Sequence, residues 1–217
     1  MKGQVEKVIL DTNIISIMFG LFKAMDKHQP LESHQNHRMY QKFFDLVEEG
    51  RLKLYITPQI LKEFLFCRGQ KPEAVDRFDR FMKKYINIIQ FRREERQKAK
   101  QITYELGNTY FKIGKSKNSQ THMVIFEKAQ TPKDRNYADA LIMAEAMISG
   151  MDVLTNNLKD FINFDLVNKL NKKYDLPGQY SVYKPNRYMK YKFPEFSHLA
   201  PEVKYKKSYN FDNGQEI

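Results

Sequence analysis

Three acidic residues of this sequence stand beside apolar segments, where a carboxylate needs a chemical reason to be. Asp11 directly follows the apolar, β-branched run 8–10. Glu63 lies in the segment 58–66, where helical geometry places apolar side chains within about 60° of it. Asp139 comes one turn into another helical pattern, near the positive end of the helix dipole, where an anion is favoured. Carboxylates that converge raise one another's pKa, and a divalent cation with oxygen ligands removes that cost.

An acidic group of this kind is suited to the cleavage of phosphate esters. A bound Mg²⁺ or Mn²⁺ lowers the pKa of a water molecule and neutralises charge on the phosphate. The whole chain has 37 Lys+Arg against 26 Asp+Glu, which gives a formal charge of +11. Such a charge attracts polyanions such as RNA, although a basic charge alone also fits a solvated lysine surface. An acidic pocket on a basic protein predicts a metal-dependent hydrolase of nucleic acid.

Strand and helix patterns alternate along the chain and must position these residues. Strands are predicted at 8–10, 52–57, 86–91 and 152–155, with a shorter strand-like piece at 179–183. Helices are predicted at 14–23, 39–49, 58–66, 72–85, 94–111 and 136–149. The alternation favours an α/β fold with a parallel sheet flanked by helices. Ligands bind outside the carboxyl ends of such strands, so polar residues after strands, Asp11 and the run 155–157, are the first candidates.

Composition excludes several classes of protein. With 217 residues, 13% of them aromatic, the chain is not disordered throughout, and its single cysteine, Cys67, excludes a disulfide scaffold and is expected to be structural and reduced. No apolar run approaches the roughly 20 residues of a membrane span. The polar start, 1–7, is not a secretory signal. We therefore expect a soluble, cytoplasmic protein without membrane contact.

The chain divides into a main domain at 1–170 and a basic, Tyr-rich C-terminal extension at 171–217. An insertion at about 114–131 interrupts the main domain with lysine, serine and glutamine. The extension interleaves aromatic and basic side chains: Tyr180, Tyr183, Tyr188, Tyr191 and Tyr205, with Lys184, Arg187, Lys190, Lys192, Lys204, Lys206 and Lys207. Such a segment suits RNA, because bases stack on aromatics and phosphates meet cations. The alternative is an arm that docks on its own domain, on a second subunit or on an inhibitor.

Four short blocks, in order over about residues 5–165, resemble the PIN-domain ribonucleases, a family that includes the toxins of VapC-type toxin–antitoxin pairs. The blocks are Val8-Ile9-Leu10-Asp11-Thr12-Asn13, Thr57-Pro58 through Glu63, Asp139-Ala140-Leu141-Ile142, and Val153-Leu154-Thr155-Asn156-Asn157 followed by Leu158-Lys159-Asp160-Phe161. The resemblance implies a PIN-like three-layer fold with a small parallel sheet flanked by helices, here with an insertion and a C-terminal extension. It also implies Mg²⁺- or Mn²⁺-dependent cleavage of RNA that leaves 5′-phosphate and 3′-hydroxyl ends.

The resemblance assigns roles to individual residues. Asp11, Glu63 and Asp139 match the family's three acidic metal ligands. Thr12 and Thr155 look like the hydroxyl residues that orient ligands or water.

A fourth position of the site stays open between Asn157 and Asp160. Asn157 falls where many members of the family have a fourth acid and others have Asn. The leading hypothesis is a metal-dependent endoribonuclease with RNA as its partner, and with an antitoxin-like inhibitor or a homodimer as further partners. The rival hypothesis is a catalytically inactive PIN-like protein that binds RNA or serves assembly. A flap-type DNA nuclease ranks last, because its site needs more acidic residues than this sequence offers.

Each acidic residue also has a purely structural interpretation. Asp11 suits the N-cap of a helix. Glu63 is within reach of Lys62 or Arg68 as an ion-pair partner, and Asp139 complements a helix dipole. At the fourth position, either residue can instead serve a turn or a cap.

Three histidines, His28, His34 and His37, lie near one another in the sequence. Neither a strand nor a helix fixes their spacing, and no cysteine is near, so we expect a mobile loop without a metal.

Overall fold

The computed structural model describes residues 5–31, 36–66, 72–113, 135–158, 164–177, 180–199, 209–210 and 215–216. Several predictions fall outside this part of the chain: the insertion at 114–131, His34, Cys67, Arg68, Asp160, and the residues 204–207 of the extension.

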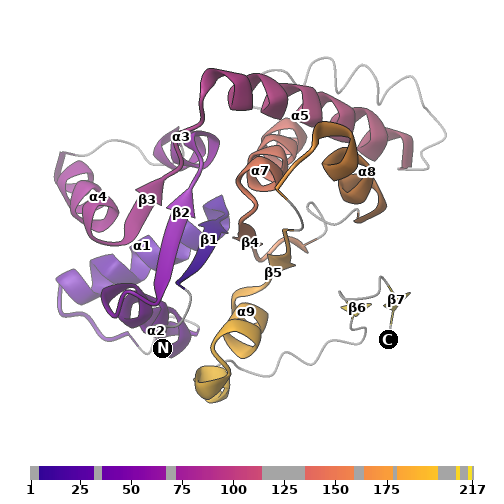
Figure 1. Ribbon diagram of the computed structural model, residues 1–217. Coiled ribbons are helices and arrows are strands. Elements are labelled where there is room, and N and C mark those ends of the chain that lie inside the picture. The colour runs from indigo at the N-terminus through magenta and orange to yellow at the C-terminus, as the bar shows by residue number, and fades with distance from the viewer. Residues whose placement is uncertain are drawn as a thin grey trace.

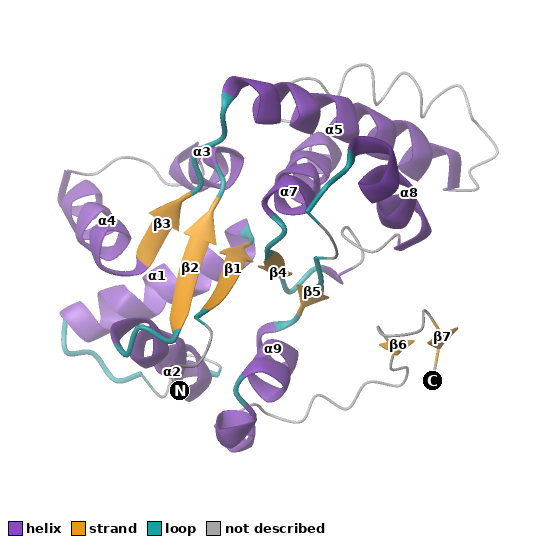
Figure 2. Cartoon of the chain, viewed as in Figure 1, coloured by secondary structure: helices purple, strands orange, loops and turns teal. Residues whose placement is uncertain are grey.

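Five parallel strands form one sheet in the order β3-β2-β1-β4-β5 (Figure 2). They are β1 (Glu6–Leu10), β2 (Leu52–Ile56), β3 (Ile86–Ile88), β4 (Asp152–Leu154) and β5 (Val182–Tyr183). The central strand is β1, whose Val8 pairs with Leu54 of β2 and Asp152 of β4. A separate antiparallel pair consists of β6 (Tyr209–Asn210) and β7 (Gln215–Glu216). The predicted fold class, an α/β protein with a small parallel sheet flanked by helices, is confirmed.

The helices pack in two groups around this sheet. One group consists of α1 (Thr12–Asp26), α2 (His37–Glu48) and α4 (Pro72–Tyr85), and the other of α5 (Arg93–Ile113), α7 (Arg135–Ser149) and α8 (Phe164–Tyr174). Figure 1 shows α1, α2 and α4 around the β3-β2-β1 part of the sheet and α5, α7 and α8 beside one another. The short helix α3 (Pro58–Phe66) contacts both groups, through α1 and α7. None of the helices in the described ranges is long and apolar enough to cross a membrane.

The core is made by apolar strands and a group of aromatic rings. Val8, Ile9 and Leu10 are fully buried, as expected of a parallel strand covered on both faces. Phe64 of α3 packs against Phe19 of α1 and Phe78 of α4, with ring centroids 5.7 and 5.0 Å away. These contacts fix α3 against the first helix group, so they also fix the acidic residue that α3 carries.

The third strand is shorter than its sequence predicts, because its partner ends. The apolar run predicted a strand at 86–91, but β3 stops at Ile88. Its neighbour β2 ends at Ile56, where Pro58 begins α3, and the last backbone hydrogen bond between them runs from Ile89 N to Ile56 O at 3.0 Å. Beyond that point β2 offers no further backbone group for pairing.

The C-terminal segment is integrated into the sheet. Residues after 170 supply β5 beside β4, then α9 (Pro185–Lys192) and η2 (Pro194–Leu199), a 3-10 helix. Tyr180 and Tyr188 are buried, and Lys192 forms ion pairs with Glu6 and Asp152, at 3.3 and 3.2 Å. Between residues 180 and 199 the extension therefore docks on its own domain, and these two tyrosines are not available to stack on bases. The division of the chain at residue 170 stays a prediction.

Candidate functional site

Because the strands are parallel, their carboxyl ends lie along one edge of the sheet, and polar side chains follow three of them. Asp11 follows β1, Thr57 follows β2 and Thr155 follows β4. All three are buried. At this edge β1 runs directly into α1 and β2 into α3, so the starts of both helices lie where the strands end.

Asp11 uses its two carboxylate oxygens differently. It is the N-cap of α1, as the structural interpretation predicted, and Oδ1 accepts a hydrogen bond from the backbone N of Thr12 at 2.6 Å. Oδ2 accepts hydrogen bonds from the Thr155 hydroxyl, at 2.6 Å, and from the Asn13 side-chain amide. The residue is only 5% exposed. Its capping role therefore occupies one oxygen and leaves the other facing β4.

The carboxyl of Asp11 is in an environment that opposes its charge. Burial raises its pKa above the ordinary value, and the nearby charge of Glu63 adds to the rise. Hydrogen bonds from Thr155, Thr12 and Asn13 favour the ionised form and act in the opposite direction. A cation at this position would relieve both the desolvation and the repulsion.

Glu63 is joined to Asp11 through Thr12. The Thr12 hydroxyl donates to Glu63 Oε2 at 2.5 Å, while the backbone N of Thr12 bonds Asp11. The other oxygen, Oε1, accepts from the Gln59 side chain one helical turn earlier, at 3.0 Å. No Lys or Arg pairs with Asp11 or Glu63 among the described residues, so the ion pair considered between Glu63 and Lys62 is not formed. Two of the three predicted acids are therefore linked through Thr12, and the hydrogen bonds given for them come from neutral groups.

A hydrogen-bonded loop after β4 completes this side of the site. The Thr155 hydroxyl accepts from the backbone N of Asn157 at 2.9 Å and from the Asn13 amide at 3.3 Å. Asn13 Oδ1 accepts from the backbone N of Asn156 at 3.1 Å, and Tyr40 of α2 hydrogen-bonds the Asn156 side chain. Asn13 thus ties α1 to the loop after β4. Sequence reasoning placed Asn13 in a motif and gave it no role, although it stands two residues after Asp11.

Asp139, the third predicted acid, is half-buried near the N-terminal end of α7. The helix leads into β4 through Gly150, which has the positive φ of 63° that glycine adopts without strain. The N-terminal end of α7 therefore points toward the carboxyl edge of the sheet. That Asp139 joins Asp11 and Glu63 around one ion stays a prediction.

One acidic residue near the site was not predicted. Glu145 of α7 is 6% exposed and interacts with the Thr57 hydroxyl and with the charge of Glu63. Burial raises the pKa of its carboxyl to about 7, the charge of Glu63 adds to the rise, and the hydrogen bond from Thr57 opposes it. Its Oε2 atom has no hydrogen-bond partner. The sequence does contain a sign of this residue, because Glu145 is the one charged residue in the stretch 140–148.

The donor chemistry of this edge fits a hard divalent cation. Within the described ranges, no group of three or more His, Cys, Asp or Glu side chains is already arranged to hold a metal ion. Mg²⁺ keeps several water ligands and commonly takes only one or two carboxylates from a protein. Asp11 and Glu63, joined through Thr12 and without cationic partners, provide such a pair.

Comparisons with known proteins find matches among solved structures. No protein-family model matches the chain, and no curated protein matches it. Among solved structures the chain is similar to the crystal structure of VapBC2 from Rickettsia felis bound to a DNA fragment from their promoter. The identity is 19% and the TM-score 0.45, over 82% of this chain and 99% of that chain. A likeness at these values indicates no activity for this protein.

Proposed function

We propose that this protein is a PIN-like, metal-dependent endoribonuclease that hydrolyses RNA phosphodiester bonds. The observation that carries the proposal is the hydrogen-bonded link Asp11–Thr12–Glu63 at the carboxyl edge of a parallel sheet. Two carboxylates are held together there, and no Lys or Arg of the described ranges forms an ion pair with either. The four sequence blocks that resemble the PIN-domain ribonucleases supply the reaction class, and the net charge of +11 suits a polyanionic substrate.

In this proposal, Asp11 and Glu63 hold Mg²⁺ or Mn²⁺, and Asp139 is the third acid assigned by the resemblance. When bound, the ion would lower the pKa of water and neutralise charge on the phosphate. Thr12 orients the Glu63 carboxylate, and Thr155 orients that of Asp11, through the hydrogen bonds described above. The fourth position stays open between Asn157 and Asp160.

The test is cleavage of a mixed RNA substrate with Mn²⁺ or Mg²⁺, with and without EDTA. We expect cleavage by the unchanged protein, no cleavage in EDTA, and loss of at least about 100-fold in Asp11→Asn, since metal-assisted charge stabilisation contributes several kcal/mol. Asn can still cap α1, so the variant is expected to fold. Cleavage that persists in Asp11→Asn or in EDTA would contradict the proposal.

The second candidate is a PIN-like protein that binds RNA without cutting it. It is favoured by Asn157, an uncharged residue where many members of the resembled family have a fourth acid. It predicts RNA binding that weakens steeply with salt and no turnover under any metal condition. Measuring RNA binding and cleavage on the same preparation separates the two candidates.

Roles as the toxin of a toxin–antitoxin pair, with a protein inhibitor and a homodimeric, cytoplasmic form, belong to the proposal through the sequence resemblance alone. Expression of the chain is then expected to arrest growth, and expression of Asp11→Asn is not.

A further inference from the structure

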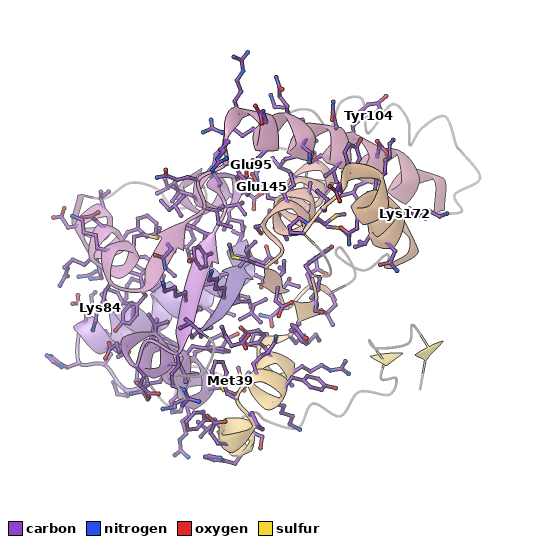
Figure 3. The ribbon with its side chains drawn as sticks, viewed as in Figure 1. Met39, Lys84, Glu95, Tyr104, Glu145 and Lys172 are labelled. Carbon is purple, nitrogen blue, oxygen red and sulfur yellow. The ribbon has the colours of Figure 1, made fainter. Side chains whose placement is uncertain are left out.

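Glu145 is a buried carboxylate whose surroundings in the protein are incomplete. The side chain lies on α7, which packs against α3, and Figure 3 labels it in that region. It is 6% exposed, and Oε2 has no hydrogen-bond partner in the part of the chain that the structure describes. A buried carboxylate oxygen without a partner is costly, so such a group calls for an explanation.

The neighbours of Glu145 do not explain why this carboxylate is buried. The Thr57 hydroxyl serves the Glu145 carboxylate and also accepts from the backbone N of Ile60 at 3.3 Å, which caps α3. The charged neighbour that acts on Glu145 is Glu63, which has the same sign. No ion pair within the described ranges includes Glu145. Among the described residues, no positively charged side chain offsets the charge of Glu145.

We propose that Glu145 is a further acidic ligand of a divalent cation, which it binds together with Glu63 on the α3–α7 side of the site. The inference rests on the proposed function and extends its metal site. Two carboxylates completed by water are a sufficient protein contribution for Mg²⁺, and oxygen donors suit Mn²⁺ equally. The cation offsets both the repulsion between the two acids and the burial of the unpaired oxygen.

The main test is the affinity for Mn²⁺, measured by electron paramagnetic resonance of the free ion during titration, so that it needs no RNA. Glu145→Gln keeps the shape of the side chain and removes its charge. We expect it to weaken Mn²⁺ binding by at least about tenfold, the lower end of the loss typical when a residue supporting a metal is removed.

A control variant separates the loss of a metal ligand from the loss of one negative charge. Glu105→Gln removes the same charge from the neighbouring helix α5, where Glu105 is paired with Lys173 at 2.7 Å, and should leave the affinity unchanged. If Glu145→Gln binds Mn²⁺ as tightly as the unchanged protein, the inference is overturned and Glu145 is structural.

A crystal of the unchanged protein soaked in Mn²⁺ gives an answer that depends on no variant. An anomalous peak in contact with Glu145 supports the inference, and a peak at Asp11 and Glu63 that leaves Glu145 free overturns it. In the second case the proposed nuclease function stands, provided that Asp11→Asn loses cleavage. If the unchanged protein binds no Mn²⁺, both proposals fall together.

Discussion

Thr155 supports a carboxylate that burial works against. Its hydroxyl donates to Asp11 Oδ2 and at the same time accepts from the backbone N of Asn157. The hydroxyl therefore connects the end of β1 to the loop after β4 at a point largely shielded from solvent, since both residues are buried. A valine of the same shape at position 155 would leave the charged oxygen with fewer donors.

We expect Thr155→Val to lower the free energy of unfolding by about 1.5–3 kcal/mol at pH 7, the typical contribution of a hydrogen bond to a charged group. Urea denaturation measures it. Thr103→Val is the matched control, because the buried Thr103 hydroxyl donates to the neutral Ala99 carbonyl of its own helix at 2.7 Å. Its loss should be smaller, about 0.5–1.5 kcal/mol. Equal losses of stability in the two variants would show that the charge of Asp11 does not strengthen its hydrogen bond with Thr155.

Glu145 predicts a pH dependence of the stability of the metal-free protein. Its folded pKa of about 7 lies above the ordinary 4.5, so the folded state binds more protons than the unfolded state between these pH values. The stability contribution is therefore complete below about pH 4.5 and is lost as pH rises to about 7, by at most about 3 kcal/mol. In Glu145→Gln, the free energy of unfolding, taken from unfolding curves across this pH range, should depend less on pH. A slope unchanged by the substitution would assign the dependence to other groups.

At the scale of elements, α3 positions the site from a hydrophobic anchor. Phe64 follows Glu63 directly and packs into the rings of Phe19 and Phe78, while Gln59 and Thr12 hold the carboxylate. The placement of the acid thus depends on apolar contacts one residue away.

We expect Phe64→Ala to lower the free energy of unfolding by about 3–5 kcal/mol, as in other cores where a phenylalanine is truncated. Leu65→Ala, at the next position, should change it by no more than about 0.5 kcal/mol because Leu65 is 43% exposed. Thermal or chemical unfolding of the pair measures the contrast. Similar losses from both positions would mean that α3 is not anchored through its aromatic side chain.

Sequence patterns predicted the elements that carry a clear local signal, such as an apolar run or a helix start. The run 8–10 identified β1, and Thr57-Pro58 identified the start of α3, where the Thr57 hydroxyl does cap the helix. The helices α8 and α9 were not predicted, because polar residues separate their apolar ones, as in the sequences FDLVNKLNKKY and PNRYMKYK. Glu145 was missed although it is the one charged residue in 140–148, because its interaction with Thr57 and Glu63 follows only from the packing of α7 against α3.

At the scale of the whole molecule, the C-terminal segment belongs to the same core as the N-terminal strand. Tyr188 of α9 is fully buried, and its ring lies 6.3 Å from that of Phe43 in α2. Its hydroxyl has no hydrogen-bond partner, and burial raises the pKa of that group above its ordinary value. The packing of the ring therefore stabilises the fold, whereas burial of the unpaired hydroxyl lowers the free energy of unfolding.

We expect Tyr188→Phe to leave stability unchanged or to raise it by up to about 1 kcal/mol, since it removes a buried, unpaired polar group. Tyr188→Ala should instead cost about 3–5 kcal/mol. Tyr191→Ala, three residues later and 68% exposed, should be close to neutral. Chemical unfolding of the three variants measures the series. A clear loss in Tyr188→Phe would mean that the hydroxyl is bonded, for instance to a water molecule.

The two outermost strands of the sheet have a consequence for assembly. At its margins the sheet ends in β3, with three residues, and β5, with two. Strands this short expose few unpaired backbone groups that a foreign chain could use to extend the sheet. A second copy or an inhibitor that binds this part of the protein would therefore have to contact side chains on the surrounding helices. Its specificity would then depend on the identity of those side chains and not on backbone pairing.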